Sequence, residues 1–321
     1  MLELFIDIKE ELEMVESELG VAVQAENQLL LETYKYLLNA GGKRLRPALC
    51  FYGAKFCDFD LQRLLPLAVA LELIHMATLV HDDVVDASIL RRGKPTINAI
   101  WGDSVSTHLG SYLFAEALLL LTRNDYPQIV YDKLSRVGVK MCEGELQQIS
   151  AAFDVTLNTR RYLQRINRKT AMLIAASAQL GAIASGSPPN IYLPLSRYGH
   201  GLGMAFQITD DILDLIADRK ELGKPIGNDL RQGTITLPVI LALCYDGPKM
   251  RLKKLVLKPQ KDEAEMREAI DIIVGSGAIE QSYLLVDKYI GKAKRALEEL
   301  PDIPAKISLQ QTADFVARRK F

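Results

Sequence analysis

Apolar residues fill long stretches of this chain, and in several stretches they recur almost all round a helix instead of along one stripe. Residues 64–86, 167–186 and 199–223 show this pattern most clearly. A helix that is apolar on every face is typical of the interior of a large protein. Strand-like alternation is scarce, and Leu, Ala, Glu and Lys are frequent, which favours helix. The pattern predicts an all-α fold.

Gly and Pro punctuate the chain at well-spaced points, where we expect helices to end. These breaks are residues 41–47, 91–96, 124–128, 185–190, 222–227, 246–249 and 300–304. No low-complexity segment or linker divides the sequence. We therefore expect one large helical domain over residues 1–321.

Composition limits the classes of partner. The 39 basic and 40 acidic side chains give a net charge of −1, so there is no overall field that attracts nucleic acid. The four cysteines lie in mostly apolar sequence without CxxC spacing, which predicts buried free thiols in a reducing compartment. The acidic N-terminus does not resemble a secretory leader, and the most apolar run, around Glu116, is too short to span a bilayer. We expect a cytoplasmic protein.

Two acidic clusters stand out against this apolar background: HDDVVD at His81–Asp86 and TDDILD at Thr209–Asp214. In each DDxxD motif the first and last aspartates are one helical turn apart and share a face. These pairs are Asp82 with Asp86 and Asp210 with Asp214. One such cluster could be a solvated helix end, but two copies in apolar sequence would be costly without a compensating cation. Carboxylates at this spacing suit Mg²⁺, which several waters and substrate phosphates also coordinate.

Basic residues recur near these clusters and at the chain breaks. They are Lys43, Arg44 and Arg46; Arg91, Arg92 and Lys94; Arg168 and Lys169, followed by Thr170; and Lys224. Arginine and lysine bind phosphate, although any one of them is more often a solvated surface residue. Together with the metal motifs and apolar helices, they predict a substrate with a diphosphate head and a hydrocarbon tail.

The segments GGKRLRP, LELIHMATLVHDDVVDASILRRGKPT, GELQQ, KTAMLI, GMAFQITDDILD and LGKPIGNDLRQGTITLP occur in an order and spacing that resemble the trans-isoprenyl diphosphate synthase family. The resemblance covers roughly residues 25–245. It implies the isoprenoid synthase fold, with a large central cavity, a dimer and a Mg²⁺ requirement. It also implies condensation of isopentenyl diphosphate with an allylic diphosphate, in which the released pyrophosphate accepts the proton.

The resemblance also implies residue roles. Asp82, Asp86 and Asp210 would be the main metal ligands, and Asp83, Asp211 and Asp214 would be ligands or their supports. Isopentenyl diphosphate would contact Lys43, Arg46, His75 and Arg92. The allylic diphosphate would contact Arg91, Lys169, Thr170, Gln207 and Lys224, with Lys169 counted among the catalytic residues. His75 could instead be a core histidine, but it lies two helical turns before Asp82 on the same face, which favours the site.

Product length is expected to depend on the turn before Asp82, because the hydrocarbon tail grows along that helix. Short-chain members of the family tend to carry aromatic residues there, whereas this chain has Ala77 and Thr78. Small side chains leave the pocket floor open, which predicts a product longer than farnesyl or geranylgeranyl diphosphate. Alternatively, another helix closes the pocket with Tyr112 or Phe114.

One motif departs from the family pattern. Many members have Lys in GKxTLP, whereas this chain has GTITLP with Thr234 in its place. The large subunits of two-component hexaprenyl and heptaprenyl diphosphate synthases show a similar change. We therefore expect farnesyl diphosphate to be extended to a C30 or C35 chain for a menaquinone-type lipid, by a heterodimer with a small regulatory subunit. The alternative is a self-sufficient homodimer with a C40 product, and either product implies transient membrane contact at release.

Three other classes of protein account for fewer of these features. A terpene cyclase can share the first motif, but its second metal motif is normally of another type. A non-catalytic partner subunit usually lacks one or both motifs, and this chain keeps both. A helical scaffold needs neither the paired motifs nor the Arg91–Arg92 pair. Chain elongation is the function that accounts for all of these features.

Overall fold

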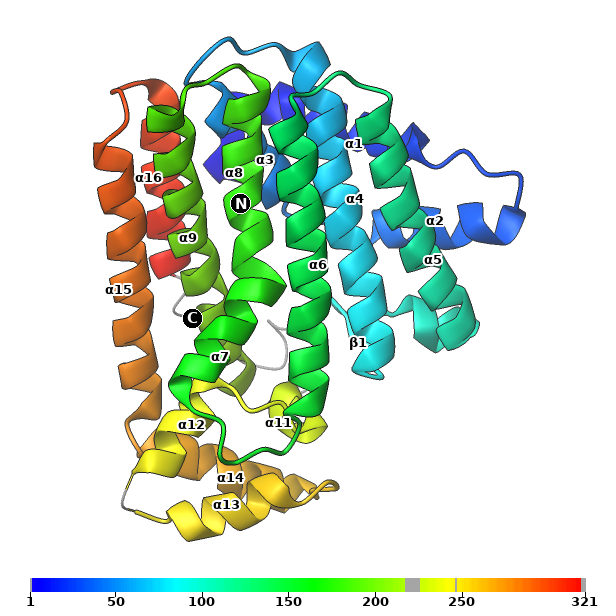
Figure 1. Ribbon diagram of the computed structural model, residues 1–321. Coiled ribbons are helices and arrows are strands. Elements are labelled where there is room, and N and C mark those ends of the chain that lie inside the picture. The colour runs from blue at the N-terminus through cyan, green and yellow to red at the C-terminus, as the bar shows by residue number, and fades with distance from the viewer. Residues whose placement is uncertain (1, 217–225, 246, 319–321) are drawn as a thin grey trace. The chain divides into compact units, whose positions relative to one another are not determined.

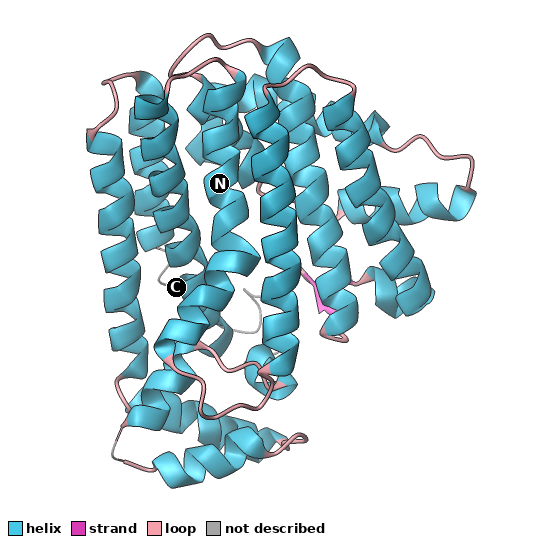
Figure 2. Cartoon of the chain, viewed as in Figure 1, coloured by secondary structure: helices cyan, strands magenta, loops and turns pink. Residues whose placement is uncertain are grey.

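The computed structural model describes residues 2–216, 226–245 and 247–318, and nearly all of its regular structure is helical (Figures 1 and 2). The all-α prediction is confirmed. Within these ranges the only strands are β1 (Leu90–Arg91) and β2 (Lys94–Pro95), which pair antiparallel. Gly93, at the turn, has a φ of +74°, which favours glycine. This hairpin lies at the break predicted over residues 91–96.

The helices follow the apolar segments, and several of them end near the predicted breaks. Others end at Ala22, Ala54, Ser150, Leu257 and Gly275, where no break was predicted. In chain order the helices are η1 (Leu2–Ile8), α1 (Lys9–Ala22), α2 (Gln28–Asn39), α3 (Leu45–Ala54), α4 (Leu61–Val85), α5 (Ile97–Thr122), α6 (Gln128–Ser150), α7 (Thr159–Ile166), the π-helical turn η2 (Asn167–Ala171), α8 (Met172–Ala184), α9 (Pro189–Ile216), α11 (Asn228–Gln232), α12 (Leu237–Cys244), α13 (Lys249–Leu257), α14 (Glu263–Gly275), α15 (Ala278–Glu298) and α16 (Pro304–Ala317).

The chain forms two compact units. Unit 1 comprises Met1–Leu134, Leu173–Gly199 and Ala296–Thr312, and unit 2 comprises Ser135–Met172, His200–Arg295 and Ala313–Phe321. The single domain over residues 1–321 stays a prediction.

In unit 1, α4 packs against α1, α3 and α5 (Figure 1). The side chain of Asp60 begins α4 by accepting a hydrogen bond from the backbone N–H of Gln62 (3.0 Å). The α3 and α8 backbones approach closely: a Cβ added at Gly53 would lie 2.0 Å from the Ala178 carbonyl oxygen, and one at Gly181 would lie 1.9 Å from that of Cys50. Glycine is required at both positions, which allows α3 to pack directly against α8.

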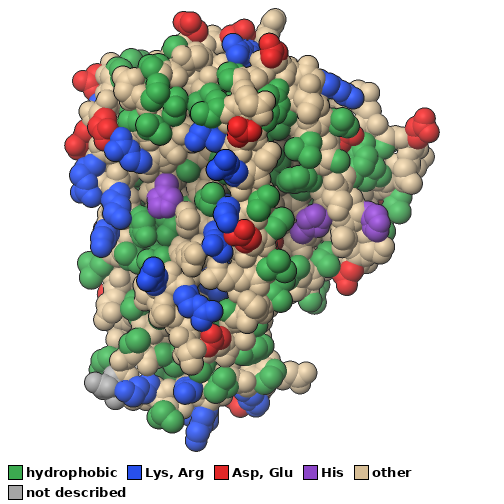
Figure 3. All heavy atoms as spheres, viewed as in Figure 1, with side chains coloured by type: hydrophobic (Ala, Val, Ile, Leu, Met, Phe, Trp, Pro, Cys, Tyr) green, Lys and Arg blue, Asp and Glu red, His purple; other side chains and the backbone are tan. Residues whose placement is uncertain are grey.

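Helices α4 and α5 are each long and apolar enough to cross a membrane by length and composition, so the short apolar run expected around Glu116 belongs to a longer helix. For α4, 72% of the apolar window is buried inside the protein, so its apolarity reflects the core. For α5 only 33% is buried. Ile100, Leu118 and Leu119 on α5 are exposed, and hydrophobic side chains appear on the surface over this helix in Figure 3.

The cysteine prediction is wrong for three of the four thiols. Cys50 is buried, whereas Cys57, Cys142 and Cys244 are exposed. Cys57 follows the end of α3, and Cys244 is the last residue of α12. Apolar neighbours in the sequence do not determine which side of a helix a residue occupies, or whether a helix end is covered.

In unit 2, α12 packs against α7, α13 and α14. Buried Arg165 on α7 donates a hydrogen bond to the carbonyl of Ile235, just before α12 (2.8 Å). The N–H of Phe153 donates to the carbonyl of Gly233 (2.8 Å), and a Cβ at Gly233 would overlap the Phe153 ring. These contacts fix the GTITLP segment beside α7.

Candidate active site

The first aspartate motif ends α4 in unit 1, and its three carboxylates have different surroundings. Asp82 and Asp86 are half-exposed, whereas Asp83 is buried. The guanidinium of Arg91 binds Asp83 with Nε (2.9 Å) and Nη2 (2.8 Å). Bidentate arginine–carboxylate pairs hold both partners firmly. Asp83 therefore orients Arg91, which is predicted to contact the allylic diphosphate.

His75 also lies on α4, and positive charges from other segments surround it. Burial lowers the pKa of His75 well below 6.5, and nearby arginines lower it further; from the strongest, they are Arg46, Arg92, Arg91 and Arg44. Burial also lowers the pKa of Arg46 to about 10. Its Nε is buried without a hydrogen-bond partner in the described part of the chain. A buried donor that lacks an acceptor, among like charges, is typical of a site that awaits an anion.

The hairpin and the loop before α3 bring two predicted basic segments together. The side chain of Arg92 donates a hydrogen bond to the carbonyl of Gly41, and Lys94 Nζ donates to that of Asn39 (2.9 Å). Lys43, also in this loop, is exposed. The segments GGKRLRP and RRGKPT thus meet in unit 1.

Arg44 has a different role from its neighbours. It is the N-cap of α3, with a φ of +45°, and its guanidinium is buried. Nη1 binds Glu72 (3.0 Å), and Nη2 binds Glu16 (3.0 Å). Sequence reasoning did not single out Glu72. Its position in an apolar helix, one turn before His75, is the signal that could have identified it.

The second aspartate motif lies on α9 in unit 2, where Asp211 is held on both oxygens. Buried Tyr162 donates its hydroxyl to Oδ2 (2.7 Å), and Gln207 donates Nε2 to Oδ1 (2.8 Å). The hydroxyl of Thr170 donates to Oε1 of Gln207 (2.6 Å). The structure thus joins the predicted residues Thr170, Gln207 and Asp211 in one network, and adds Tyr162, which sequence reasoning missed.

Asp214, the last residue of that motif, lies on α9, and its carboxylate contacts the first residues of α11. It accepts hydrogen bonds from the backbone N–H groups of Asn228 (3.2 Å) and Asp229 (3.1 Å). A carboxylate at a helix N-terminus is stabilised by those N–H groups. Asp210 is half-exposed. Asp214 therefore holds the first turn of α11 against α9.

Lys169 and Thr170 belong to the π-helical turn η2 between α7 and α8, and such turns are frequent at functional sites. Lys169 Nζ pairs with Glu145 Oε2 on α6 (2.8 Å). Gly144 allows this approach, because a Cβ there would lie 3.0 Å from that of Arg168. The GELQQ and KTAMLI segments therefore meet in unit 2.

The remaining predicted positions are less defined by contacts. Lys224 lies outside the described residues. Thr234 is half-buried, and its N–H donates to the carbonyl of Asp229 (2.8 Å). Ala77 is buried, and the Thr78 hydroxyl donates to the carbonyl of His75 (2.7 Å).

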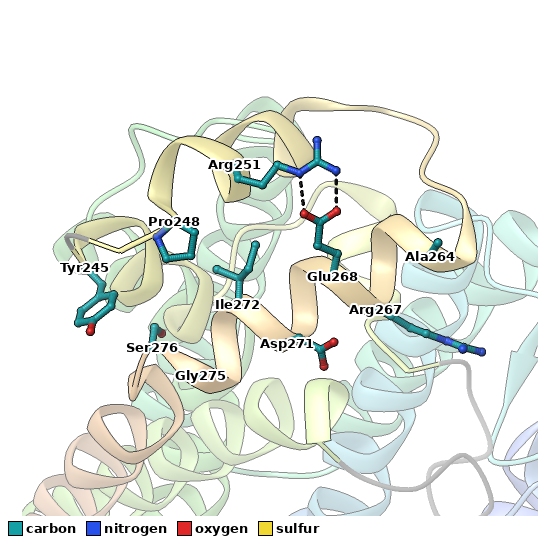
Figure 4. Close-up of a pocket in the computed structure, with 10 residues that line it drawn as sticks. All are labelled: Tyr245, Pro248, Arg251, Ala264, Arg267, Glu268, Asp271, Ile272, Gly275 and Ser276. Carbon is teal, nitrogen blue, oxygen red and sulfur yellow. Dashed lines mark hydrogen bonds and ion pairs between the residues drawn. The ribbon is translucent and has the colours of Figure 1, made fainter.

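An open pocket of about 730 Å³ lies beside α13 and α14 (Figure 4). Arg251 and Glu268 form a paired contact there, with Nε–Oε1 at 2.7 Å and Nη2–Oε2 at 2.5 Å. No sequence-predicted site residue lines this pocket.

Excess negative charge at the second motif suits a divalent cation. Burial raises the pKa of Asp211 to about 7 and that of Asp214 well above its usual range, and Asp229 raises both further. A cation would favour the ionised carboxylates. The described residues contain no group of three or more acidic, His or Cys side chains that forms a ready-made metal cage. Mg²⁺ needs none, because waters and substrate phosphates complete its coordination.

Comparison with known proteins shows the family to which this chain belongs. A sequence model of the polyprenyl synthetase family matches residues 27–273. The chain belongs to the polyprenyl synthetase family. As a member it is a polyprenyl diphosphate synthase, a prenyltransferase.

Individual family members are similar over almost the whole chain. Heptaprenyl diphosphate synthase component 2 of Geobacillus stearothermophilus is 45% identical over 98% of this chain and 97% of its own length. The crystal structure of a Caulobacter crescentus CB15 polyprenyl synthase, complexed with calcium and isoprenyl diphosphate, is 34% identical, with a TM-score of 0.95 and coverage of 100% and 98%. That of Staphylococcus aureus heptaprenyl diphosphate synthase is 37% identical, with a TM-score of 0.92 and coverage of 98% and 99%. The isoprenoid synthase fold is confirmed.

Proposed function

We propose that this prenyltransferase condenses isopentenyl diphosphate with farnesyl diphosphate and repeats the step to form an all-trans C30–C35 polyprenyl diphosphate. The observation that carries the proposal is the basic cluster around His75, with the buried, unpartnered Nε of Arg46. His75 itself lies on α4, the helix that ends in the first aspartate motif. A diphosphate would supply both the missing acceptor and the missing negative charge.

The proposed diphosphate contacts are those that the family resemblance implies. Isopentenyl diphosphate binds Lys43, Arg46, His75 and Arg92, and the allylic diphosphate binds Arg91, Lys169, Thr170, Gln207 and Lys224. Two of the latter group are oriented by carboxylates, Arg91 by Asp83 and Lys169 by Glu145. Such pairing fixes the direction of long side chains before the substrate arrives.

Mg²⁺ is the proposed metal, held by Asp82, Asp86 and Asp210. When bound, it neutralises the diphosphate and so favours departure of that group. The other three aspartates support the site through their hydrogen bonds. Asp83 orients Arg91, and Asp211 binds Tyr162 and Gln207. Asp214 contacts the start of α11. Apolar side chains of α4 exclude water from the reacting carbons, and the departing pyrophosphate takes the proton.

The product length rests on the relatives and on α4. Two of the similar proteins are named for a heptaprenyl product. Ala77 and Thr78 place no aromatic side chain in the turn before Asp82. Such a product would supply the side chain of a menaquinone-type lipid, after transient membrane contact at release from a cytoplasmic enzyme.

We further propose a heterodimer in which this chain is one polyprenyl synthase domain over residues 1–321 and a small regulatory subunit is its partner. The Geobacillus relative is named component 2, which implies another component. The exposed apolar residues of α5 provide a surface that a protein partner can cover. Thr234, in place of the usual Lys, is the feature that a partner would compensate.

A product assay tests this function. The purified chain is incubated with Mg²⁺, farnesyl diphosphate and labelled isopentenyl diphosphate, with and without candidate small subunits, and the dephosphorylated products are sized. We expect a ladder that ends at C30–C35 only when a partner is present. A C40 ladder from the chain alone would establish the homodimer instead, and a cyclised product would refute elongation.

Two variants and a matched control connect the product to the site. Asp82→Ala and Asp210→Ala are expected to abolish elongation. Asp132→Ala removes an exposed carboxylate of α6 and is expected to leave it unchanged. Retained elongation in either of the first two variants would contradict the proposed metal ligands.

A further inference from the structure

Glu72 is a buried acid for which the proposed reaction has no use. Its exposed fraction is 2%, and it lies on α4 one turn before His75. Oε1 accepts a hydrogen bond from Arg44 (3.0 Å), whereas Oε2 is buried with no hydrogen-bond partner among the residues that the structure describes. A carboxylate that is left half-satisfied in the interior is costly to stability and calls for an explanation.

The charges nearby supply one. Burial lowers the pKa values of Arg46 and Arg92, and neighbouring arginines lower them further. The negative charge of Glu72 raises both values, and Asp83 also raises that of Arg92. Glu16, the second partner of Arg44, is not among the charges that shift either pKa, and its side chain is 46% exposed. Of the two acids that bind Arg44, only Glu72 therefore acts on the arginines proposed to bind isopentenyl diphosphate.

We propose that Glu72 is a positioning residue that serves as the resident counter-charge of this basic cluster and limits how tightly the cluster holds a diphosphate. The inference rests on the proposed function. Clustered guanidiniums repel one another, and one buried carboxylate lets them coexist before the ligand arrives. The same carboxylate repels the incoming diphosphate, which weakens binding.

Weakened binding has a purpose in a repeating reaction. After each condensation, the diphosphate of the extended chain occupies the isopentenyl position and must leave it before the next round. A cluster of arginines without a counter-charge would hold that group too long. Glu72 therefore favours turnover over ground-state affinity.

The test compares Glu72→Gln with Glu16→Gln in the full chain. Thermal unfolding is measured in EDTA, with and without inorganic pyrophosphate, and pyrophosphate affinity is measured by calorimetry. Glutamine keeps a hydrogen-bonding oxygen for Arg44 and removes the charge. Without ligand, Glu72→Gln is expected to unfold at a lower temperature than the wild type. Its pyrophosphate affinity is expected to rise on the order of tenfold, as removal of one nearby charge implies. Glu16→Gln should keep the wild-type affinity.

Steady-state kinetics supply a second measurement. Glu72→Gln is expected to lower both the KM for isopentenyl diphosphate and kcat. A purely structural defect would not lower the two together. If Glu72→Gln does not fold, Glu72→Asp is used, which retains the charge and is expected to bind pyrophosphate as the wild type does.

The outcomes separate the two proposals. If the wild type binds pyrophosphate and Glu72→Gln binds it no more tightly, the role of Glu72 is refuted and the proposed function stands. Tighter pyrophosphate binding by Glu72→Asp would refute that role in the same way. If the wild type does not bind pyrophosphate in EDTA, the anion site in the proposed function fails, and the role of Glu72 fails with it.

Discussion

Tyr162 offers a direct test of how the second aspartate motif is built. Its side chain is fully buried, and its hydroxyl donates to Asp211, whose exposed fraction is 4% (O–O distance 2.7 Å). Tyr162→Phe removes this one oxygen. At pH 8 and above, Asp211, with a pKa of about 7, is ionised. A hydrogen bond to such a charged group contributes about 1.5–3 kcal/mol to the free energy of unfolding. The variant is expected to lose about that much stability.

Activity should fall as well, because Asp211 adjoins the proposed metal ligand Asp210. Loss of a group that supports a metal ligand typically lowers metal affinity or activity about 10–100-fold. The assays are urea unfolding and the initial rate of prenyl transfer at several Mg²⁺ concentrations.

The matched control is Tyr198→Phe. Tyr198 is also fully buried, but its hydroxyl donates to a backbone carbonyl, that of Leu309 (2.8 Å). This variant is expected to lose about 1 kcal/mol and to keep its activity. The reasoning is refuted if Tyr162→Phe keeps the wild-type rate and Mg²⁺ dependence, or if both variants lose activity equally.

Two further predictions concern unit 1. Asp83→Asn weakens the pair between Asp83 and Arg91, whose side chains are 7% and 22% exposed respectively. In urea unfolding, the variant should lose about 1.5–3 kcal/mol of stability, whereas exposed Asp132→Asn should have no effect. Equal stability of the two variants would contradict this. His75 has a folded-state pKa below its unfolded value of about 6.5, so the protein should lose stability as pH falls below about 6.5, and His75→Gln should remove that part of the loss. Proton NMR of His75 should show the low pKa rising when pyrophosphate is added, and an unshifted pKa would argue against an anion site here.

The sequence by itself determined the helices, their breaks and the motifs that show the family. Helical periodicity is local: Asp86 lies four positions after Asp82, so their shared face follows from the chain alone. The Gly and Pro positions likewise predicted several helix ends and the break at residues 91–96, where the structure has a hairpin.

Tertiary structure decided which role each motif residue takes. Asp83 binds Arg91, Asp214 accepts hydrogen bonds from the first residues of α11, and Arg44 turns inward to Glu72. Sequence reasoning had grouped the two aspartates with the metal motifs and Arg44 with the phosphate-binding basic residues. Tyr162 reaches Asp211 across 49 positions of the chain, and three of the four thiols proved to be exposed. Contacts of this kind depend on how distant helices pack, which no local pattern encodes.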